Sequence, residues 1–287
     1  MTGVQTCALP ICNYYKGIRE ERGYSLGDVA RSNDNLSKSQ ISRFESGLSM
    51  LTTDRFLLAI KAINMTPNEF FSLWTDEPNQ YQVFGKKIRD YEITKDIVGL
   101  KKLIKENAKL KRDKFFNILT KAVILDLTGK NLLTKVEKTF LNRHFNRIYQ
   151  WTMFDLSIFN RCLALLDEEE VYDLGQDMLD SDSLSVLFLQ NSDRVKKTAI
   201  NLYIFLISKG WYRRAERIKE ILDDFITEWD MEEKISLHIF KKVSRYKQKI
   251  NTELLIDIQD DIDRLRKFGA VGIAERFEKI LNLVINA

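Results

Sequence analysis

Residues 37–47 of the chain are Ser-Lys-Ser-Gln-Ile-Ser-Arg-Phe-Glu-Ser-Gly. A serine that can cap a helix opens this stretch, and a glycine that can end a helix closes it. Between them Ile41 and Phe44 are three residues apart, which places both on one apolar face of a helix. The stretch therefore predicts a short amphipathic helix with an outward polar face. That face is formed by Lys38, Ser39, Gln40 and Arg43.

This polar face has the chemistry of a helix that lies in the major groove of DNA. Arg43 and Gln40 can pair with the edges of guanine and adenine, and they are our first choices for base contacts. Ser37, Lys38 and Ser39 are at the N-terminus of the helix, where backbone N–H groups also attract phosphate. We expect these three residues to contact the DNA backbone. The alternative is an ordinary capped helix on a protein surface.

Further short helices are expected on both sides of this stretch, within residues 13–74. In chain order they are expected at residues 14–21, 26–30 and 37–47, from residue 53 or 54 onward, and from residue 67 onward. Ser25 is placed to cap the second helix and Pro67 to begin the fifth. Two helices joined by a short turn inside a bundle of five form a helix-turn-helix (HTH) domain.

The charges of this segment predict weak attraction to DNA. Lys16, Arg19 and Arg22 of the first helix are expected on its outer side, either as phosphate contacts or as surface charges without a role. Glu45 is expected to be structural. Residues 13–74 contain eight Lys or Arg against seven Asp or Glu, a net charge of +1. Because DNA affinity depends on neutralising phosphates, we expect two copies to bind together as a homodimer.

The rest of the chain is also predicted to be helical, so the fold class is all-α. Only 3 prolines and 12 glycines interrupt 287 residues, too few for a sheet protein with many tight turns. Residues 75–79 are polar and contain the last proline, which makes them the expected domain boundary. Helices are expected near residues 80–92, 95–107, 111–127, 133–149, 151–166, 168–180, 193–208, 211–228, 232–248, 252–268 and 271–285.

These helices form pairs at a spacing of roughly 35–42 residues, which suggests a helical-repeat domain over residues 80–287. One pair is especially clear. Gly210 ends the helix expected at residues 193–208, the aromatic residues 211–212 fill the corner, and the small Ala215 allows a close approach. This hairpin resembles a degenerate tetratricopeptide (TPR) unit. The alternative is an irregular helical bundle.

Motifs for enzyme chemistry are missing from the sequence. It contains no glycine-rich nucleotide-binding fingerprint and no nucleophile elbow. His144 and His238 are in amphipathic helices, away from any cluster of cysteines or carboxylates. Cys7, Cys12 and Cys162 form no CxxC pair and are expected to be thiols in a reducing compartment. We therefore expect no enzyme activity, no cofactor and no metal.

The sequence shows no membrane segment. No apolar run approaches the ~18–20 residues that a spanning helix needs, so we expect a cytoplasmic protein without a membrane partner. The first twelve residues, MTGVQTCALPIC, lack amphipathic periodicity, and Pro10 lies where periodicity should begin. We expect these twelve residues to be an artefact of sequence assembly that has replaced the true first residues, and they are left out of the fold prediction.

Several motifs resemble one family. LSKSQISRFESG at residues 36–47, the LT-x-x-R-x-L pattern at residues 51–57 and Asn-Met-Thr-Pro-Asn-Glu-Phe at residues 64–70 are similar to the N-terminal domain of the Rgg (Rgg/GadR/MutR) transcriptional regulators. Members join a Cro/repressor-type HTH domain to C-terminal helical repeats. The likeness continues in Trp-Thr-Met-Phe-Asp at residues 151–155 and in Leu-Arg-Lys-Phe-Gly at residues 265–269.

The resemblance implies a homodimer that binds promoter DNA through both HTH domains, with RNA polymerase as a further candidate partner. In many members the concave face of the repeats receives a short hydrophobic pheromone peptide, held by asparagine and arginine side chains. By position Asn201 matches one such asparagine, and Arg161 falls where another polar contact is expected. The family arginine one turn later corresponds here to Ala164, so the peptide specificity is expected to differ.

Two other functions remain open at this point. The repeats could serve only to dimerise a DNA-binding regulator or to bind a protein partner. Alternatively, they could be an adaptor that binds and inhibits an enzyme, with an HTH domain that no longer binds DNA. For Asn201, a structural role on a neighbouring loop carbonyl is the alternative to peptide binding.

Overall fold

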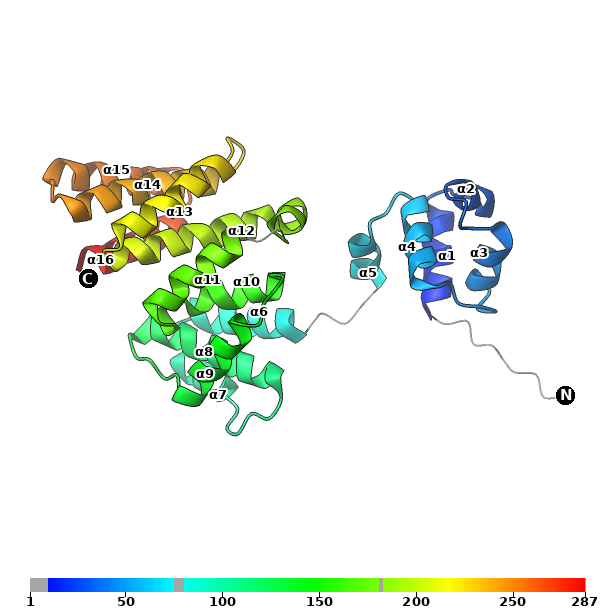
Figure 1. Ribbon diagram of the computed structural model, residues 1–287, viewed down its shortest axis with the longest axis horizontal. Helices are drawn as coiled ribbons and strands as arrows, with labels where there is room; N and C mark the ends of the chain where they lie inside the picture. The colour runs from blue at the N-terminus through cyan, green and yellow to red at the C-terminus, as the bar shows by residue number, and fades with distance from the viewer. Residues whose placement is uncertain (1–9, 75–79, 181–182, 287) are drawn as a thin grey trace. The chain divides into compact units, whose positions relative to one another are not determined.

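The computed structural model describes residues 10–74, 80–180 and 183–286. Every regular element in these ranges is helical (Figure 1), which confirms the predicted all-α class. The contacts divide the chain into two compact units, with the division between Val83 and Phe84. We call them the HTH unit and the C-terminal unit and describe each by itself. The boundary expected at residues 75–79 lies outside the described residues.

The HTH unit has the five predicted helices. They are α1 (Pro10–Glu21), α2 (Leu26–Arg31), α3 (Lys38–Glu45), α4 (Thr53–Ala62) and α5 (Pro67–Trp74). Their apolar sides meet in one core, in which Tyr15 is in edge-to-face contact with Phe44 and Phe56. The Tyr15 hydroxyl donates to the carbonyl of Ala59 at 3.0 Å, so the one polar atom of this ring is satisfied in the core.

The start of α1 corrects one prediction. The first helix begins at Pro10, and the side chain of Cys12 is fully buried in the core. Proline suits the first position of a helix because its missing N–H would have had no partner there. Residues 10–12 therefore belong to the fold, although they were excluded from it. The remainder of that N-terminal stretch, including Cys7, lies outside the described residues.

The C-terminal unit is a succession of helices, the first of which crosses the division between Val83 and Phe84. They are α6 (Gln80–Ile93), α7 (Ile97–Leu103), α8 (Lys111–Thr128), α9 (Lys135–Phe145), α10 (Met153–Cys162), the short 3₁₀ helix η1 (Leu163–Leu165), α11 (Glu168–Asp180), α12 (Ser183–Ser208), α13 (Tyr212–Phe225), α14 (Met231–Gln248), α15 (Thr252–Lys267) and α16 (Val271–Asn286). Most bounds agree with the sequence periodicity. The largest difference is at α12, which begins ten residues earlier than expected, and α7 and α9 each end four residues earlier.

The alternate helices α8, α10, α12 and α14 contact one another in that order, and we call them the inner row. Within the unit α13 packs beside α12, α15 packs beside α14, α11 packs against α12, and α16 packs against α12, α14 and α15. In Figure 1 the succession runs from α7 and α9 at one end of the unit to α14 and α15 at the other. This arrangement agrees with the predicted helical repeats.

Two local features explain why the repeats pack closely. A Cβ atom added to Gly175 on α11 would clash with the buried side chain of Leu202 on α12, so the glycine lets the two helices pack closely without a shift of that side chain. At the end of α12, Gly210 has a φ of +74° and turns the chain into α13, where Ala215 is buried. The predicted hairpin is therefore confirmed.

Candidate DNA-binding and peptide-binding sites

The stretch that was expected to form a recognition helix is α3. Ser37 is its N-cap: its hydroxyl accepts from the N–H of Gln40 at 3.2 Å, and its own N–H donates to Oε1 of Gln40 at 3.0 Å. This reciprocal pair is a capping box. Ile41 and Phe44 are buried in the core of the unit. The predicted helix and its inward face are therefore confirmed.

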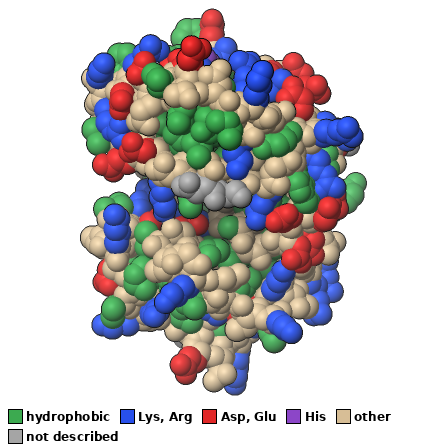
Figure 2. Space-filling model, turned by 90° about the vertical axis from the view of Figure 1, so that its left-hand side faces the viewer, with side chains coloured by type: hydrophobic (Ala, Val, Ile, Leu, Met, Phe, Trp, Pro, Cys, Tyr) green, Lys and Arg blue, Asp and Glu red, His purple; other side chains and the backbone are tan. Residues whose placement is uncertain are grey.

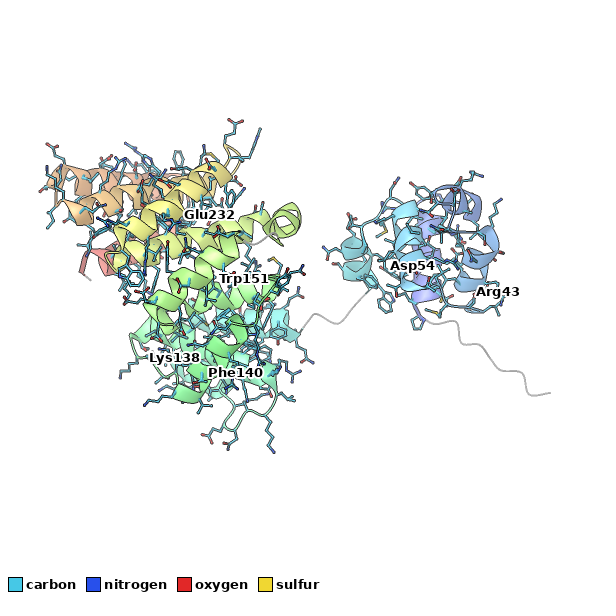
Figure 3. The ribbon with its side chains drawn as sticks, viewed as in Figure 1. Arg43, Asp54, Lys138, Phe140, Trp151 and Glu232 are labelled. Atoms are coloured by element: carbon cyan, nitrogen blue, oxygen red, sulfur yellow. The ribbon has the colours of Figure 1, made fainter. Side chains whose placement is uncertain are left out.

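The polar side of α3 remains accessible. Ser37, Lys38, Ser39 and Arg43 are exposed, and Gln40 is half-buried. Figure 3 labels Arg43, which extends from the outer side of the helix. The capping box uses the side-chain oxygen of Gln40, so its amide N–H₂ group keeps its donors. Such a face can lie against a duplex, but direct contact with DNA stays a prediction for all five residues.

Arg19 is not on the outer side of α1, where we expected it. It lies one helical turn after the buried Tyr15, and its guanidinium is itself buried. Its Nε and Nη2 donate to the two carboxylate oxygens of Glu45 at 2.6 and 2.8 Å, and Nη1 donates to the carbonyl of Tyr24 at 2.6 Å. The hydrogen bond with Glu45 raises the pKa of Arg19 further. A phosphate cannot reach this group, so the phosphate-contact prediction for Arg19 is wrong.

The same ion pair gives Glu45 a structural role, as expected. Because Glu45 is the last residue of α3, the pair fastens the end of α3 to α1. Lys16 of α1 and Arg22, which directly follows α1, are exposed. Arg22 donates to the carbonyls of Ile63 and Asn64 at 3.0 and 3.2 Å, which ties α1 to the end of α4. Lys16 remains a predicted phosphate contact.

In the C-terminal unit, Asn201 and Arg161 are brought close together by the inner row. The Nδ2 of Asn201 on α12 donates to Oδ1 of Asn160 on α10 at 2.7 Å, and Asn160 immediately precedes Arg161. From α16, Arg276 donates to Oδ1 of Asn201 at 3.2 Å. The partners of Asn201 are therefore side chains, and the loop carbonyl considered as an alternative partner is not among the hydrogen bonds of the described residues.

Arg161 is held by carboxylates from two other helices. It donates to both oxygens of Glu92 on α6, at 2.9 and 2.6 Å, and lies 3.8 Å from Asp126 on α8. Burial raises the pKa of Asp126, against the opposing effect of the positive charges of Arg161 and Lys279. Lys279 on α16 donates to the backbone carbonyl of Asp126 at 2.9 Å. Both proposed peptide contacts thus have partners within the protein itself.

The sequence did not reveal these partners. Glu92, Asn160 and Arg276 are charged or amide residues of a kind found throughout the chain, and Arg276 is 75 positions from Asn201. No local motif indicates such a pairing. Each of them contacts a side chain of α10 or α12 from another helix, and only the arrangement of the helices determines these contacts.

Space beside these residues is small. A cavity of about 20 Å³ lies among α12, α14 and α16 and is lined by Asn201, Ile204, Arg276 and Phe277, among others. A larger groove, of about 530 Å³, lies elsewhere, between α13, α14 and α15. Of the two residues predicted to hold a peptide, Asn201 lines the smaller cavity and Arg161 lines neither of the two.

The histidines and cysteines have ordinary structural surroundings. His144 contacts Asp155 at 2.8 Å and His238 contacts Asp261 at 3.2 Å, so each has a carboxylate neighbour that the sequence did not indicate. Cys162 is buried, which raises the pKa of its thiol to about 12. Across residues 10–74, 80–180 and 183–286, no group of three or more His, Cys, Asp or Glu is arranged to hold a metal ion.

No helix in those same three ranges combines the length and the apolar character that crossing a membrane would need.

Comparison with solved structures shows the same fold over almost the whole chain. The SHP pheromone receptor Rgg2 of Streptococcus dysgalactiae is 19% identical, with a TM-score of 0.75 over 94% of this chain and 99% of that one. A transcriptional regulator of Listeria monocytogenes EGD-e is 16% identical, with a TM-score of 0.72 over 96% and 97%. The PrgX/cCF10 complex is 12% identical, with a TM-score of 0.70 over 96% and 92%.

Family models divide the chain in the same way as its contacts. The model of a helix-turn-helix domain matches residues 16–70, which lie in the HTH unit. The model of the C-terminal domain of the HTH-type transcriptional regulator Rgg matches residues 100–279, more than half of the chain. Together with the fold, these matches confirm the resemblance that the motifs indicated: the chain belongs to the Rgg family of HTH-type transcriptional regulators.

Proposed function

We propose that this regulator binds promoter DNA as a homodimer through residues 13–74 and responds to a short hydrophobic peptide held by residues 80–287. The observation that supports DNA binding is the accessible polar face of α3, whose two ends are fixed by the Ser37–Gln40 capping box and the Arg19–Glu45 ion pair. A helix fixed at both ends presents its side chains in one orientation, which reading a base sequence requires.

Each residue of the accessible polar face of α3 is assigned a role in DNA binding. Arg43 and Gln40 contact base edges, because guanidinium and amide groups match guanine and adenine. Ser37, Lys38 and Ser39 contact phosphates, together with Lys16 on α1. Arg22 makes at most a secondary contact, since two carbonyls already accept from its guanidinium. The two HTH domains of a dimer would bind half-sites about one duplex turn apart, or a multiple of it.

Substitution of Arg43 tests this assignment. In Arg43→Ala the dimer should stay folded while site-specific retention on promoter DNA is lost, because the exposed Arg43 side chain lies outside the core of the HTH unit. Genome-wide mapping of bound promoters would show the change directly. Arg55→Ala, at a half-buried arginine of α4, is a matched control for the loss of one positive charge. Unchanged sequence preference in Arg43→Ala would refute the assignment.

Peptide binding is supported by Asn201 and Arg161, and by two structures of similar fold. Rgg2 is named as an SHP pheromone receptor, and PrgX was solved in complex with cCF10. An asparagine amide can donate to and accept from an extended peptide backbone, which suits a ligand of varied sequence. The bound peptide would replace Asn160 and Arg276 at Asn201, and it would favour one arrangement of the protein over another.

Glu92→Gln and Arg161→Ala should separate the two sides of the Glu92–Arg161 ion pair. Loss of the carboxylate charge frees the guanidinium for a ligand, so Glu92→Gln should bind peptide more tightly, whereas Arg161→Ala should bind it more weakly. The measurement is capture of members of a mixed library of short hydrophobic peptides. Equal capture by both variants and the wild type would remove Arg161 from the proposed site.

A second candidate is a regulator whose repeats only dimerise or bind a protein partner. The cavity of about 20 Å³ beside Asn201 favours this candidate, because a peptide can enter only after side chains move. Absence of peptide capture at micromolar concentrations would support it. If the purified protein also failed to bind any promoter, an adaptor function would be favoured instead.

A regulator of this kind has a defined place and manner of action in the cell. A promoter-binding regulator works in the cytoplasm, where bacterial DNA and imported peptides meet, and it acts by contact rather than by catalysis. A bound dimer can change transcription by contacts with RNA polymerase or by blocking it. Promoter mapping with and without conditioned medium would show which promoters respond, and short reading frames beside them would suggest the peptide.

A further inference from the structure

Residues 101–114 carry an unusual amount of positive charge. They contain seven Lys or Arg residues and two acidic residues, a net charge of +5, whereas the whole chain has a net charge of +4. All other residues together therefore have a net charge of −1. We call residues 101–114 the basic corner. It comprises the last turn of α7, the connection to α8 and the first turn of α8.

The cations of this corner are mostly unneutralised. Its basic residues are Lys101, Lys102, Lys105, Lys109, Lys111, Arg112 and Lys114, of which the five before Arg112 are exposed. Asp113 is already shared by Lys105 at 3.1 Å and Arg112 at 3.4 Å. Within the described residues, no carboxylate is paired with Lys101, Lys102, Lys109 or Lys111. Four positive charges therefore face solvent without a partner.

The corner is a fixed surface. Buried Asn117 of α8 accepts from the backbone N–H of Lys105 at 2.9 Å and donates to the carbonyl of Lys105 at 2.8 Å. These two bonds pin the middle of the connection between α7 and α8. In addition, Lys111 and Arg112 occupy the first two positions of α8, where the helix dipole disfavours positive charge. Folding of α8 gains nothing from cations at this position.

On the face of the C-terminal unit in Figure 2, blue and red side chains are interspersed, as is usual for a solvated surface. The basic corner departs from that pattern within fourteen residues. Its excess of charge contrasts with the HTH unit, whose residues 13–74 have a net charge of only +1. Because phosphate neutralisation supplies most of the sequence-independent affinity for DNA, the regulator needs more positive charge than that unit provides.

We propose that the basic corner is a second DNA-binding surface, which holds backbone phosphates of the duplex and reads no bases. The inference rests on the proposed DNA-binding function and adds to it a surface in the C-terminal unit. Lys101, Lys102, Lys109 and Lys111 supply the contacts. Their ammonium groups are point charges on flexible stems, which suits phosphates of any sequence.

The test compares salt dependence of DNA binding in two full-length variants. The corner variant carries Lys101→Gln, Lys102→Gln, Lys109→Gln and Lys111→Gln. The control variant carries the same change at four exposed lysines elsewhere, Lys130, Lys234, Lys249 and Lys267. Affinity for duplex DNA of random sequence is measured over a series of NaCl concentrations. Thermal unfolding of both variants checks that they fold like the wild type.

Each lost phosphate contact reduces the slope of log Kobs against log[NaCl] by about 0.9. The slope of the corner variant should therefore fall by about two to four per chain, while the control keeps the wild-type slope. Equal slopes in the corner variant and the wild type, or equal losses in both variants, would overturn the inference. Lysine-dependent binding to vesicles of anionic lipid without a change in DNA slope would also overturn it and indicate a membrane surface.

The outcome separates this inference from the proposed function. Arg43→Ala should remove sequence preference and leave the contribution of the corner to the salt slope unchanged. The corner variant should keep its sequence preference. A wild-type protein that bound no duplex even at low salt would overturn both proposals, whereas loss of the corner effect alone leaves promoter recognition by α3 intact.

Discussion

Each unit of the protein contains an arginine that holds a glutamate with two hydrogen bonds, and the two pairs differ in burial. In the HTH unit the side chains of Arg19 and Glu45 are 7% and 5% exposed. In the C-terminal unit those of Arg161 and Glu92 are 37% and 28% exposed. A buried pair cannot be broken without leaving a charge in the core, whereas a half-exposed pair can be exchanged for water or a ligand. Similar chemistry therefore suits a fixed joint in one unit and a replaceable contact in the other.

The largest expected effect tests this difference. Arg19→Ala should destabilise the HTH unit by about 3–5 kcal/mol because Glu45 is left buried and unpaired. Arg161→Ala should cost less than about 1 kcal/mol, since its pair is partly solvated. Chemical denaturation followed by circular dichroism measures both. Similar losses in the two variants would contradict the comparison, and recovery of stability in Arg19→Met with Glu45→Leu would support it.

Two glycines sharpen the comparison at the level of packing. Gly175→Ala should destabilise the C-terminal unit by about 1–3 kcal/mol because the new Cβ meets the Leu202 side chain. Gly17→Ala in α1 is the control: no atom lies within 4 Å of its added Cβ. That change should stabilise the HTH unit by about 0.5–1 kcal/mol through lower chain entropy. Thermal unfolding of each unit measures both changes. A more stable Gly175→Ala or a less stable Gly17→Ala would contradict the comparison.

Helix caps are expected to give smaller and more equal effects in the two units. Ser25 caps α2 and Thr152 caps α10, each in a reciprocal pair with an aspartate three residues later. Ser25→Ala and Thr152→Ala should each cost about 1 kcal/mol, because a backbone N–H loses its acceptor. Urea titration measures the loss. Serine at position 152 should restore most of the stability, and failure to do so would show that the threonine methyl group matters instead.

The smallest expected effect is a dependence of stability on acid pH. Burial alone would raise the pKa of Asp155, but hydrogen bonds from His144 and Thr152 outweigh it, so this pKa lies below the usual value of an aspartate. A carboxyl whose pKa is lower in the folded state than in the unfolded state stabilises the fold at pH values above its pKa in the unfolded state. This stabilisation is lost as the pH falls through the lowered pKa of the folded state. Asp155→Asn should not show this loss of stability in acid. Urea unfolding of the wild type and the variant at several acidic pH values measures it, and the same pH dependence in both proteins would contradict the prediction.

Local signals explain why much of the fold was predictable. The positions of α3, α8, α14 and α15 follow from apolar periodicity and from caps such as Ser37, which act over a few residues. The same signals failed at residues 10–12, because Pro10 was considered as an interruption and not as the first residue of a helix. They also missed the first ten residues of α12, where the chain has no proline or glycine to mark a boundary.

The candidate sites were predictable only in part. The polar face of α3 was found because its side chains are close in sequence and their direction follows from Ile41 and Phe44. The inward turn of Arg19 was missed, although its spacing from Tyr15 was a usable signal. The contacts of Asn201 with Asn160 and Arg276 had no such signal, since they join positions 41 and 75 residues apart.

The sequence by itself determined most of the helices, the polar face of α3 and the family, because these depend on side-chain periodicity and on motifs within short segments. Tertiary structure alone decided which charges are buried and which are available. It buried Arg19 in an ion pair with Glu45, gave Arg161 and Asn201 partners within the protein, and left five lysines of the basic corner exposed. The physical reason is that the free energy of a charge depends on its solvent and its neighbours, which come from distant parts of the chain.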